Sequence, residues 1–177
     1  MPEKKTDVWM SWVALATAIM AVLAAITTLY LGKYSSRAIL NQGQETSQWA
    51  YYQAKSIKSY IYEIQKQKLE LDTMAPLAKP KAVKDKYAQF IANYDKQITR
   101  YDKEKDEIKA TAENLAKSKE EAQARAGNFG YALIFLQIAI MLSSISALTK
   151  KKPLFYTGIA TVTGWLFFFL DAIFLFY

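Results

Sequence analysis

Asp171 is the residue whose position most clearly invites chemistry. It is the one acidic residue in the apolar run Trp165–Phe174. A charged, unpaired carboxylate inside a bilayer costs about 3 kcal/mol or more, so it should be protonated, paired or in contact with water. The polar candidates at a similar depth in the other apolar runs are Gln137, Thr27 and Thr28, and Lys33, two residues after the first run, could extend its side chain toward Asp171. Gln137 is the expected partner. Two interpretations stay open: a proton- or cation-handling group, or an interhelical hydrogen bond.

Two further groups of side chains are candidates for an interaction face. On a helix, Trp49, Tyr52 and Gln53 share one side and form a mixed aromatic and amide face, and Lys55 is a further candidate in this group. The second group recurs every seven residues and consists of Tyr87, Tyr94 and Tyr101. Aromatic side chains at helical spacing usually contact a neighbouring helix, so we interpret both groups as packing surfaces rather than ligand sites.

Composition excludes several classes of function. The chain has no cysteine and no histidine, which removes disulfides, thiolate or histidine metal sites and histidine-containing catalytic triads. No phosphate-binding glycine loop is present. We therefore predict a protein that is not an enzyme and that holds no metal or cofactor. The net charge is +7, but acids alternate with lysines along the polar segment, which argues against a nucleic-acid partner.

Three apolar runs predict three transmembrane helices. Val8–Leu31 has 24 residues without a charge, or roughly 36 Å of helix, and the others are Phe129–Leu148 and Leu154–Tyr177. The first run is longer than the apolar part of a signal peptide, so we expect an uncleaved anchor. Its alanines at positions 14, 18, 21 and 25 would place small side chains on one face, as in closely packed membrane helices.

The segment between the first two runs predicts a helical arm. Pro76 and Pro80 interrupt it, because proline cannot occupy the interior of a regular helix. Apolar residues at heptad spacing on both sides predict an antiparallel, coiled-coil-like hairpin in which Ile57 lies near Ile98 and Ile64 lies near Phe90. Gly127 and Gly130, where the arm re-enters the membrane, predict a helix break or a hinge.

The predicted fold class is therefore all-α, with eight segments. They are a basic tail (1–7), transmembrane helix 1 (8–31), an ascending arm helix (32–75), a proline turn (76–81), a returning arm helix (82–127), transmembrane helix 2 (128–148), a basic loop (149–153) and transmembrane helix 3 (154–177). Lysines in the tail and in the loop predict that both are cytoplasmic, which would place the arm in the periplasm of a multi-pass inner-membrane protein.

A short run at the start of the arm carries a resemblance to a known family. Residues 48–58 read Gln-Trp-Ala-Tyr-Tyr-Gln-Ala-Lys-Ser-Ile-Lys. This W-x-x-Y-Q-A-K-S-I-K pattern resembles an uncharacterised bacterial membrane family, domain of unknown function 4337. The resemblance implies a prokaryotic membrane protein with this same order of helices, and it implies no activity.

The arm also motivates a hypothesis about function. Two helices with one narrow apolar stripe each would be marginally stable alone, so the bilayer-anchored chain should associate with further copies. We therefore predict a non-enzymatic membrane scaffold that forms a homo-oligomer through the hairpin and the small-residue membrane faces. The alternative is a small oligomeric ion or proton channel that uses Asp171. A third option is an accessory subunit of another membrane protein.

Overall fold

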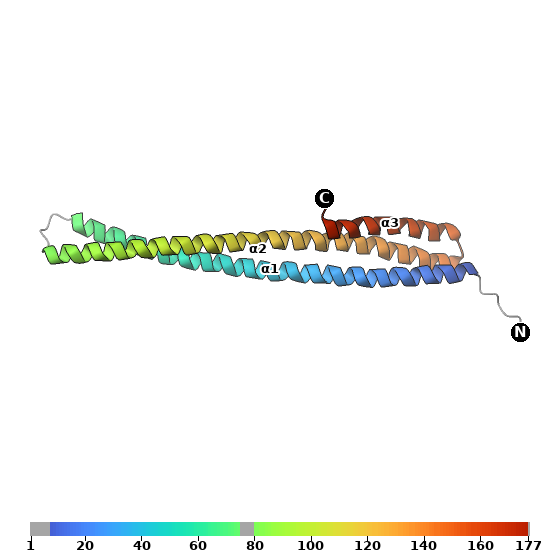
Figure 1. Ribbon diagram of the computed structural model, residues 1–177. Coiled ribbons are helices and arrows are strands. Elements are labelled where there is room, and N and C mark those ends of the chain that lie inside the picture. The colour runs from blue at the N-terminus through green and yellow to red at the C-terminus, as the bar shows by residue number, and fades with distance from the viewer. Residues whose placement is uncertain (1–7, 75–79, 177) are drawn as a thin grey trace, which may run out of the picture. The chain divides into compact units, whose positions relative to one another are not determined.

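The computed structural model describes residues 8–74 and 80–176 (Figure 1). Within these ranges 97% of the residues are helical and none is in a strand. The helices are α1 (Val8–Met74), α2 (Lys81–Thr149) and α3 (Lys152–Phe174). The all-α fold class is therefore confirmed. Most of the predicted proline turn lies outside the described residues, but Pro80 O accepts hydrogen bonds from the amides of Val83 and Lys84 at the start of α2.

Each of the three helices contains a window long and apolar enough to cross a membrane. This confirms the prediction of three membrane-capable helices. The window of α1 lies near its N-terminus, whereas α3 is apolar along nearly all its length. Side chains on these windows are largely uncovered by the rest of the chain, as expected for a surface that faces lipid.

Helices α1 and α2 both continue without interruption from the apolar window into the polar segment. The break predicted at Gly127 and Gly130 is therefore wrong, because both residues lie inside α2. A glycine costs a helix about 1 kcal/mol relative to alanine, and the many hydrogen-bonded residues on each side outweigh that cost.

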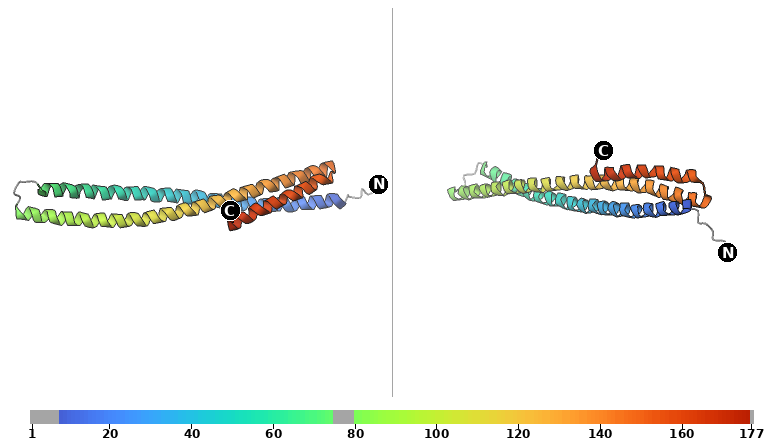
Figure 2. Two further views of the ribbon diagram at one scale, coloured as in Figure 1. Left: turned by 90° about the horizontal axis from the view of Figure 1, so that it is seen from above. Right: turned by 45° about the vertical axis from the view of Figure 1, so that its right-hand side comes forward.

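The chain divides into two compact units. We call residues 8–40 and 118–176 the membrane unit and residues 41–117 the arm unit. Figure 2 shows, for the membrane unit, α3 alongside the C-terminal part of α2 in both views. Each unit is described below by its own contacts.

The core of the membrane unit forms where α1, α2 and α3 meet. Met20, Leu136 and Ala139 are buried, and their partly buried neighbours include Val162 and Trp165. Helices α2 and α3 approach closely because Gly158 has no side chain: a Cβ there would lie 3.1 Å from the carbonyl oxygen of Ala139. Lys150, in the left-handed conformation (φ 56°), and Lys151 join the two helices.

The packed face of α1 in the membrane unit differs from the predicted one. Val13, Met20 and Thr27, seven residues apart, are buried. The small residues that we expected to mediate helix packing are all exposed, and they are Ala14, Ala18, Ala21 and Ala25. Within one chain they contact neither α2 nor α3 closely enough to be covered. This face is therefore available to another helix.

In the arm unit, two ion pairs join α1 to α2. The pair that lies later in α1 uses the residue that lies earlier in α2. Lys55 Nζ lies 2.5 Å from Glu104 Oε2, and Lys66 Nζ lies 2.6 Å from Asp95 Oδ1. Between these ion pairs, the ring of Tyr62 stacks on that of Tyr101 at 5.8 Å. Polar and aromatic side chains of α1 thus occupy the face toward α2.

The apolar row that we expected at this contact lies elsewhere. Ile57, Ile64 and Leu71 are 59%, 65% and 69% exposed, and Phe90 is 50% exposed. The predicted proximity of Ile64 to Phe90 and of Ile57 to Ile98 is therefore wrong. Lysine and tyrosine side chains can bury their stems and rings while their polar tips find partners, so this face of α1 competes successfully with the isoleucine row.

Candidate functional sites

The carboxylate of Asp171 lies in the last full turn of α3 and is only 5% exposed. Its Oδ2 accepts a hydrogen bond of 2.7 Å from Asn128 Nδ2 on α2, and its Oδ1 accepts one of 2.9 Å from the backbone N–H of Phe176. The amide of Leu175, in the left-handed conformation, also donates to the carbonyl oxygen of Asp171. The residue therefore closes the C-terminus of α3 and attaches it to α2.

The expected partner of Asp171, Gln137, is exposed and lies nine residues along α2 from Asn128. Nine residues span roughly 13 Å of helix, so the predicted pairing is wrong. The physical reason is the register of α2 and α3. The short connection at Lys150 and Lys151 places residues at equal distances from it opposite each other, and Asp171 thus falls near Asn128.

Arg125 is a residue that our sequence reasoning did not select for this site. Its Nη1 donates hydrogen bonds to the carbonyl oxygens of Ala172 (3.0 Å) and Ile173 (2.6 Å). These carbonyls belong to the last turn of α3, which has no intrahelical donors for them, and a cation there also interacts favourably with the helix dipole. The signal in the sequence was the spacing of Arg125 and Asn128, which places both on one face of α2.

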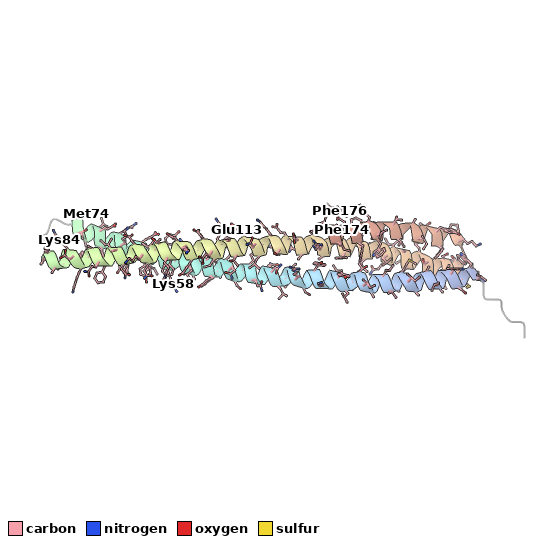
Figure 3. The ribbon with its side chains drawn as sticks, viewed as in Figure 1. Lys58, Met74, Lys84, Glu113, Phe174 and Phe176 are labelled. Atoms are coloured by element: carbon pink, nitrogen blue, oxygen red, sulfur yellow. The ribbon has the colours of Figure 1, made fainter. Side chains whose placement is uncertain are left out.

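Aromatic rings surround this end of the membrane unit. Phe129 is 1% exposed, and its ring lies 5.5 Å from Tyr30, 5.7 Å from Tyr34 and 5.4 Å from Phe169. At the C-terminal end of α3, its last residue Phe174 stacks on Phe176 at 5.3 Å, and both are exposed (Figure 3). Such a ring of aromatic side chains is typical of a membrane–water boundary.

The remaining membrane candidates do not join Asp171. Thr27 is fully buried and its Oγ1 accepts a hydrogen bond of 3.1 Å from Trp165 Nε1. Thr28 is exposed and donates to the carbonyl oxygen of Ala24. Lys33 is exposed, with Nζ 6.0 Å and 5.8 Å from the ring centroids of Tyr30 and Tyr34. The structure thus distributes the five predicted polar residues over several places and does not form a polar path from them.

In the arm unit, Lys55 is the best-connected of the predicted residues. A hydrogen bond to Glu104 raises the pKa of Lys55, with a further contribution from Tyr51. The hydrogen bond from Lys55 lowers the pKa of Glu104, with smaller contributions from nearby cations. Lys55 Nζ also lies 5.4 Å from the ring centroid of Tyr101. The arrangement is an ion pair against an aromatic ring, which suits helix packing.

The other predicted residues of the arm are contacts of the same kind. Trp49 and Tyr52 meet edge to face at 5.7 Å, and Gln53 is exposed. Tyr94 donates a hydrogen bond of 3.1 Å to Gln65 Oε1, and Tyr101 is buried. Tyr87 is partly buried. The structure brings Tyr94 and Tyr101 together around Tyr62, at 5.7 Å and 5.8 Å.

No group of three or more acidic side chains that could hold a metal ion occurs among residues 8–74 and 80–176. The fold and these contacts define the class: an all-α protein with three helices able to cross a membrane. The model of the family described as domain of unknown function (DUF4337) matches residues 9–175. The chain belongs to this family, and the predicted resemblance is confirmed. No curated protein and no solved structure matches the chain.

Proposed function

We propose that this protein is a non-enzymatic membrane scaffold that forms homo-oligomers through its arm unit and the outer face of α1. In this proposal the arm is an antiparallel, coiled-coil-like hairpin outside the bilayer. The N-terminal tail and the loop 149–153 are cytoplasmic, in the inner membrane, because their lysines favour that side. The arm is then periplasmic.

The observation that carries the proposal is an exposed apolar row on α1. Ile57, Ile61, Ile64 and Leu71 are all exposed, and their spacing of four, three and seven residues keeps them on one heptad face. Burying an isoleucine or leucine side chain contributes about 1.5 to 3 kcal/mol, so leaving this row in water is unfavourable. A partner helix that covers the row would stabilise the arm.

A second copy of the same helix fits this row best. Copies inserted in one bilayer with the same orientation hold their arms parallel, so each isoleucine meets its own counterpart at the same height. Lys68 is the single charged residue on the heptad positions between Ile57 and Leu71. One polar residue at such a position is a known way to select register and oligomer number at some cost in stability.

The membrane unit offers a second surface through which copies of the chain could associate. The exposed alanines at positions 14, 18, 21 and 25 let another helix approach closely. The alternative function, a channel that uses Asp171, has less support. The oxygens of that carboxylate accept hydrogen bonds from Asn128 and Phe176, which fits a structural role.

The test is the mass of the purified full chain in nanodiscs or detergent. We expect an oligomer for the original sequence and a monomer for the double variant Ile57→Gln/Ile64→Gln. Phe90→Gln, which changes another exposed apolar residue of the arm, is the control and should leave the mass unchanged. Helix content by circular dichroism should be the same for all, because these side chains are exposed in the single chain.

Three results would contradict the proposal. If the original chain is a monomer, the protein does not self-associate. If the double variant is still an oligomer, the exposed isoleucine row is not the contact between copies. Co-purification of a different protein on this face would make the chain an accessory subunit instead. Proton or cation flux in liposomes that Asp171→Asn abolishes, with assembly intact, would favour the channel.

A further inference from the structure

In the membrane unit, α1 carries an exposed heptad pattern besides its buried one. Val13, Met20 and Thr27, seven residues apart, are buried. A second set of large side chains, with alternating spacings of three and four residues, is exposed. We call this set the outer row, and it consists of Trp12, Leu15, Ile19, Val22, Ile26 and Leu29. These residues occupy the two heptad positions, called a and d, through which the helices of a coiled coil meet.

The surface along the outer row has two shallow hollows. The first is lined by Val8, Ser11, Trp12 and Leu15, and the second by Ala18, Ile19, Val22 and Leu23. In a coiled coil, each contacting side chain of one helix enters a hole between four residues of the facing helix. The first hollow has such a set, with heptad positions d, g, a and d. Ser11 and Ala18 are small residues beside the row, so a partner helix can approach closely.

The heptad count of the outer row continues along α1, which is a single helix from Val8 to Met74. Leu29 and Ile57 are four heptads apart, so the outer row and the exposed isoleucine row of the arm unit occupy the same two heptad positions. Every residue at these positions between Leu29 and Ile57 is exposed as well. A straight helix departs from a seven-residue repeat by about 20° per heptad, so a repeat kept over this length is typical of helices that supercoil around each other.

The residues beside these positions are compatible with a parallel second copy in register. In a parallel pair, the g position of one helix faces the following e position of the other, and charges there set the choice of partner. In the arm unit Gln53 would face Lys58, Tyr60 would face Gln65, and Gln67 would face Asp72. None of these pairs brings two like charges together. A copy in the same bilayer also presents the same side chains at the same height.

We propose that the outer row of α1 packs against the outer row of a second copy, so that both units use the same two heptad positions of α1 for the contact. This inference rests on the proposed function and specifies its contact within the membrane. Ala18 and Ala25 flank the row, whereas Ala14 and Ala21 lie at position c, away from the partner. Lipid is as apolar as these side chains, so close packing into the hollows stabilises the contact.

Single cysteines in the full chain test the outer row directly. Val22→Cys and Ile26→Cys should each give a covalent dimer on mild oxidation in the membrane, because parallel copies bring these positions within the Cα separation of about 4.4 to 6.8 Å that a disulfide requires. Ala21→Cys is the matched control, since Ala21 is exposed, next to Val22, and at a position that faces away from the partner. It should stay monomeric.

The pattern of dimers separates this inference from the proposed function. A dimer yield for Ala21→Cys equal to or above that for Val22→Cys would overturn the outer row as the contact. Monomers for Val22→Cys and Ile26→Cys, together with a dimer through Ile64→Cys in the arm unit, would mean that the outer row faces lipid. That result would overturn this inference and leave self-association through the arm. Monomers at all of these positions would overturn both.

A second variant tests the packing without cross-linking. Ile19→Trp/Val22→Trp fills the second hollow with larger rings and keeps the surface apolar. The dissociation constant of the oligomer, measured by sedimentation equilibrium of the full chain in detergent, should rise by on the order of tenfold, because the contact becomes overpacked. Ile134→Trp/Ile138→Trp makes the same change at exposed positions of α2 and should leave the constant unchanged. Equal constants for the two variants would overturn the proposal.

Discussion

The side-chain amide of Asn128 lies 2.7 Å from the Asp171 carboxylate, and this contact joins α2 to the last turn of α3. Arg125, three residues before Asn128, donates to two carbonyl oxygens of the same turn. Arg125 thus satisfies two of the carbonyl groups that a helix end leaves without intrahelical partners, and Asn128 holds the Asp171 side chain of the same turn. The acidic residue within an apolar run is thus explained as the end of a helix held by its neighbour.

Replacing Asp171 should therefore destabilise the membrane unit. Asp171→Leu leaves the amides of Asn128 and Phe176 without their acceptor, and a buried donor without a partner costs about 1 to 3 kcal/mol. We expect a loss of this size in the free energy of unfolding measured by detergent titration. Gln137→Leu, on an exposed face of α2, should change it little. Equal losses for the two variants would show that Asp171 has no special structural role.

The close approach of α2 and α3 leads to a second expected outcome. Gly158→Leu would place side-chain atoms where a Cβ already lies 3.1 Å from Ala139 O and 3.2 Å from Leu142 Cβ. Overpacking of this kind costs about 1 to 3 kcal/mol. At Gly127 no atom lies within 4 Å of a built Cβ, so Gly127→Leu should stabilise α2 by up to about 1 kcal/mol. Thermal unfolding in detergent measures both changes in stability. Gly158→Leu should lower the midpoint temperature and Gly127→Leu should raise it.

The ion pair of the arm predicts a dependence on pH. The folded-state pKa of Glu104 is lowered from its ordinary 4.5, so its contribution to stability is present above that value and is lost as the pH falls through the folded pKa. The folded-state pKa of Lys55 is raised from 10.5, so its contribution is present below that value and is lost as the pH rises through the raised pKa. The pair therefore stabilises the arm across the neutral range.

Glu104→Gln tests this dependence in the full chain. We expect a lower melting temperature than the original at neutral pH, and a difference that shrinks as the pH falls below 4.5. Asp106→Asn is a matched control on α2, because Asp106 is exposed and forms no ion pair among the described residues. A difference for Glu104→Gln that is independent of pH would exclude the ion pair as its cause.

The long apolar runs of this chain made its three membrane-capable helices predictable, whereas the contacts between particular residues on neighbouring helices were not. The three membrane-capable helices follow from apolar runs, because every residue in such a run contributes in the same direction. The partner of Asp171 depends on the register between α2 and α3, which a two-residue connection with a left-handed Lys150 determines. A count outward from Lys150 leads to Phe129, the residue next to Asn128.

The face that α1 turns toward α2 in the arm was also beyond prediction. Two rows on α1 have heptad spacing, one with Ile57 and Ile64 and the other with Tyr52, Ser59 and Lys66. Hydrophobicity alone favours the isoleucine row. The choice depends on specific partners on the other helix, such as Asp95 for Lys66, and periodicity does not contain that information.

Cysteine cross-linking gives the most direct test of which row faces another copy. The chain has no cysteine, so a single substitution introduces the only thiol. Parallel copies in register would bring the two Ile64→Cys residues within the Cα separation of about 4.4 to 6.8 Å that a disulfide requires. We expect a covalent dimer on mild oxidation in the membrane. Ser59→Cys is the control on the opposite row and is fully buried against α2, so it should stay monomeric. A dimer through Ser59→Cys and none through Ile64→Cys would mean that α1 turns its isoleucine row toward α2 and its tyrosine and lysine row toward the second copy.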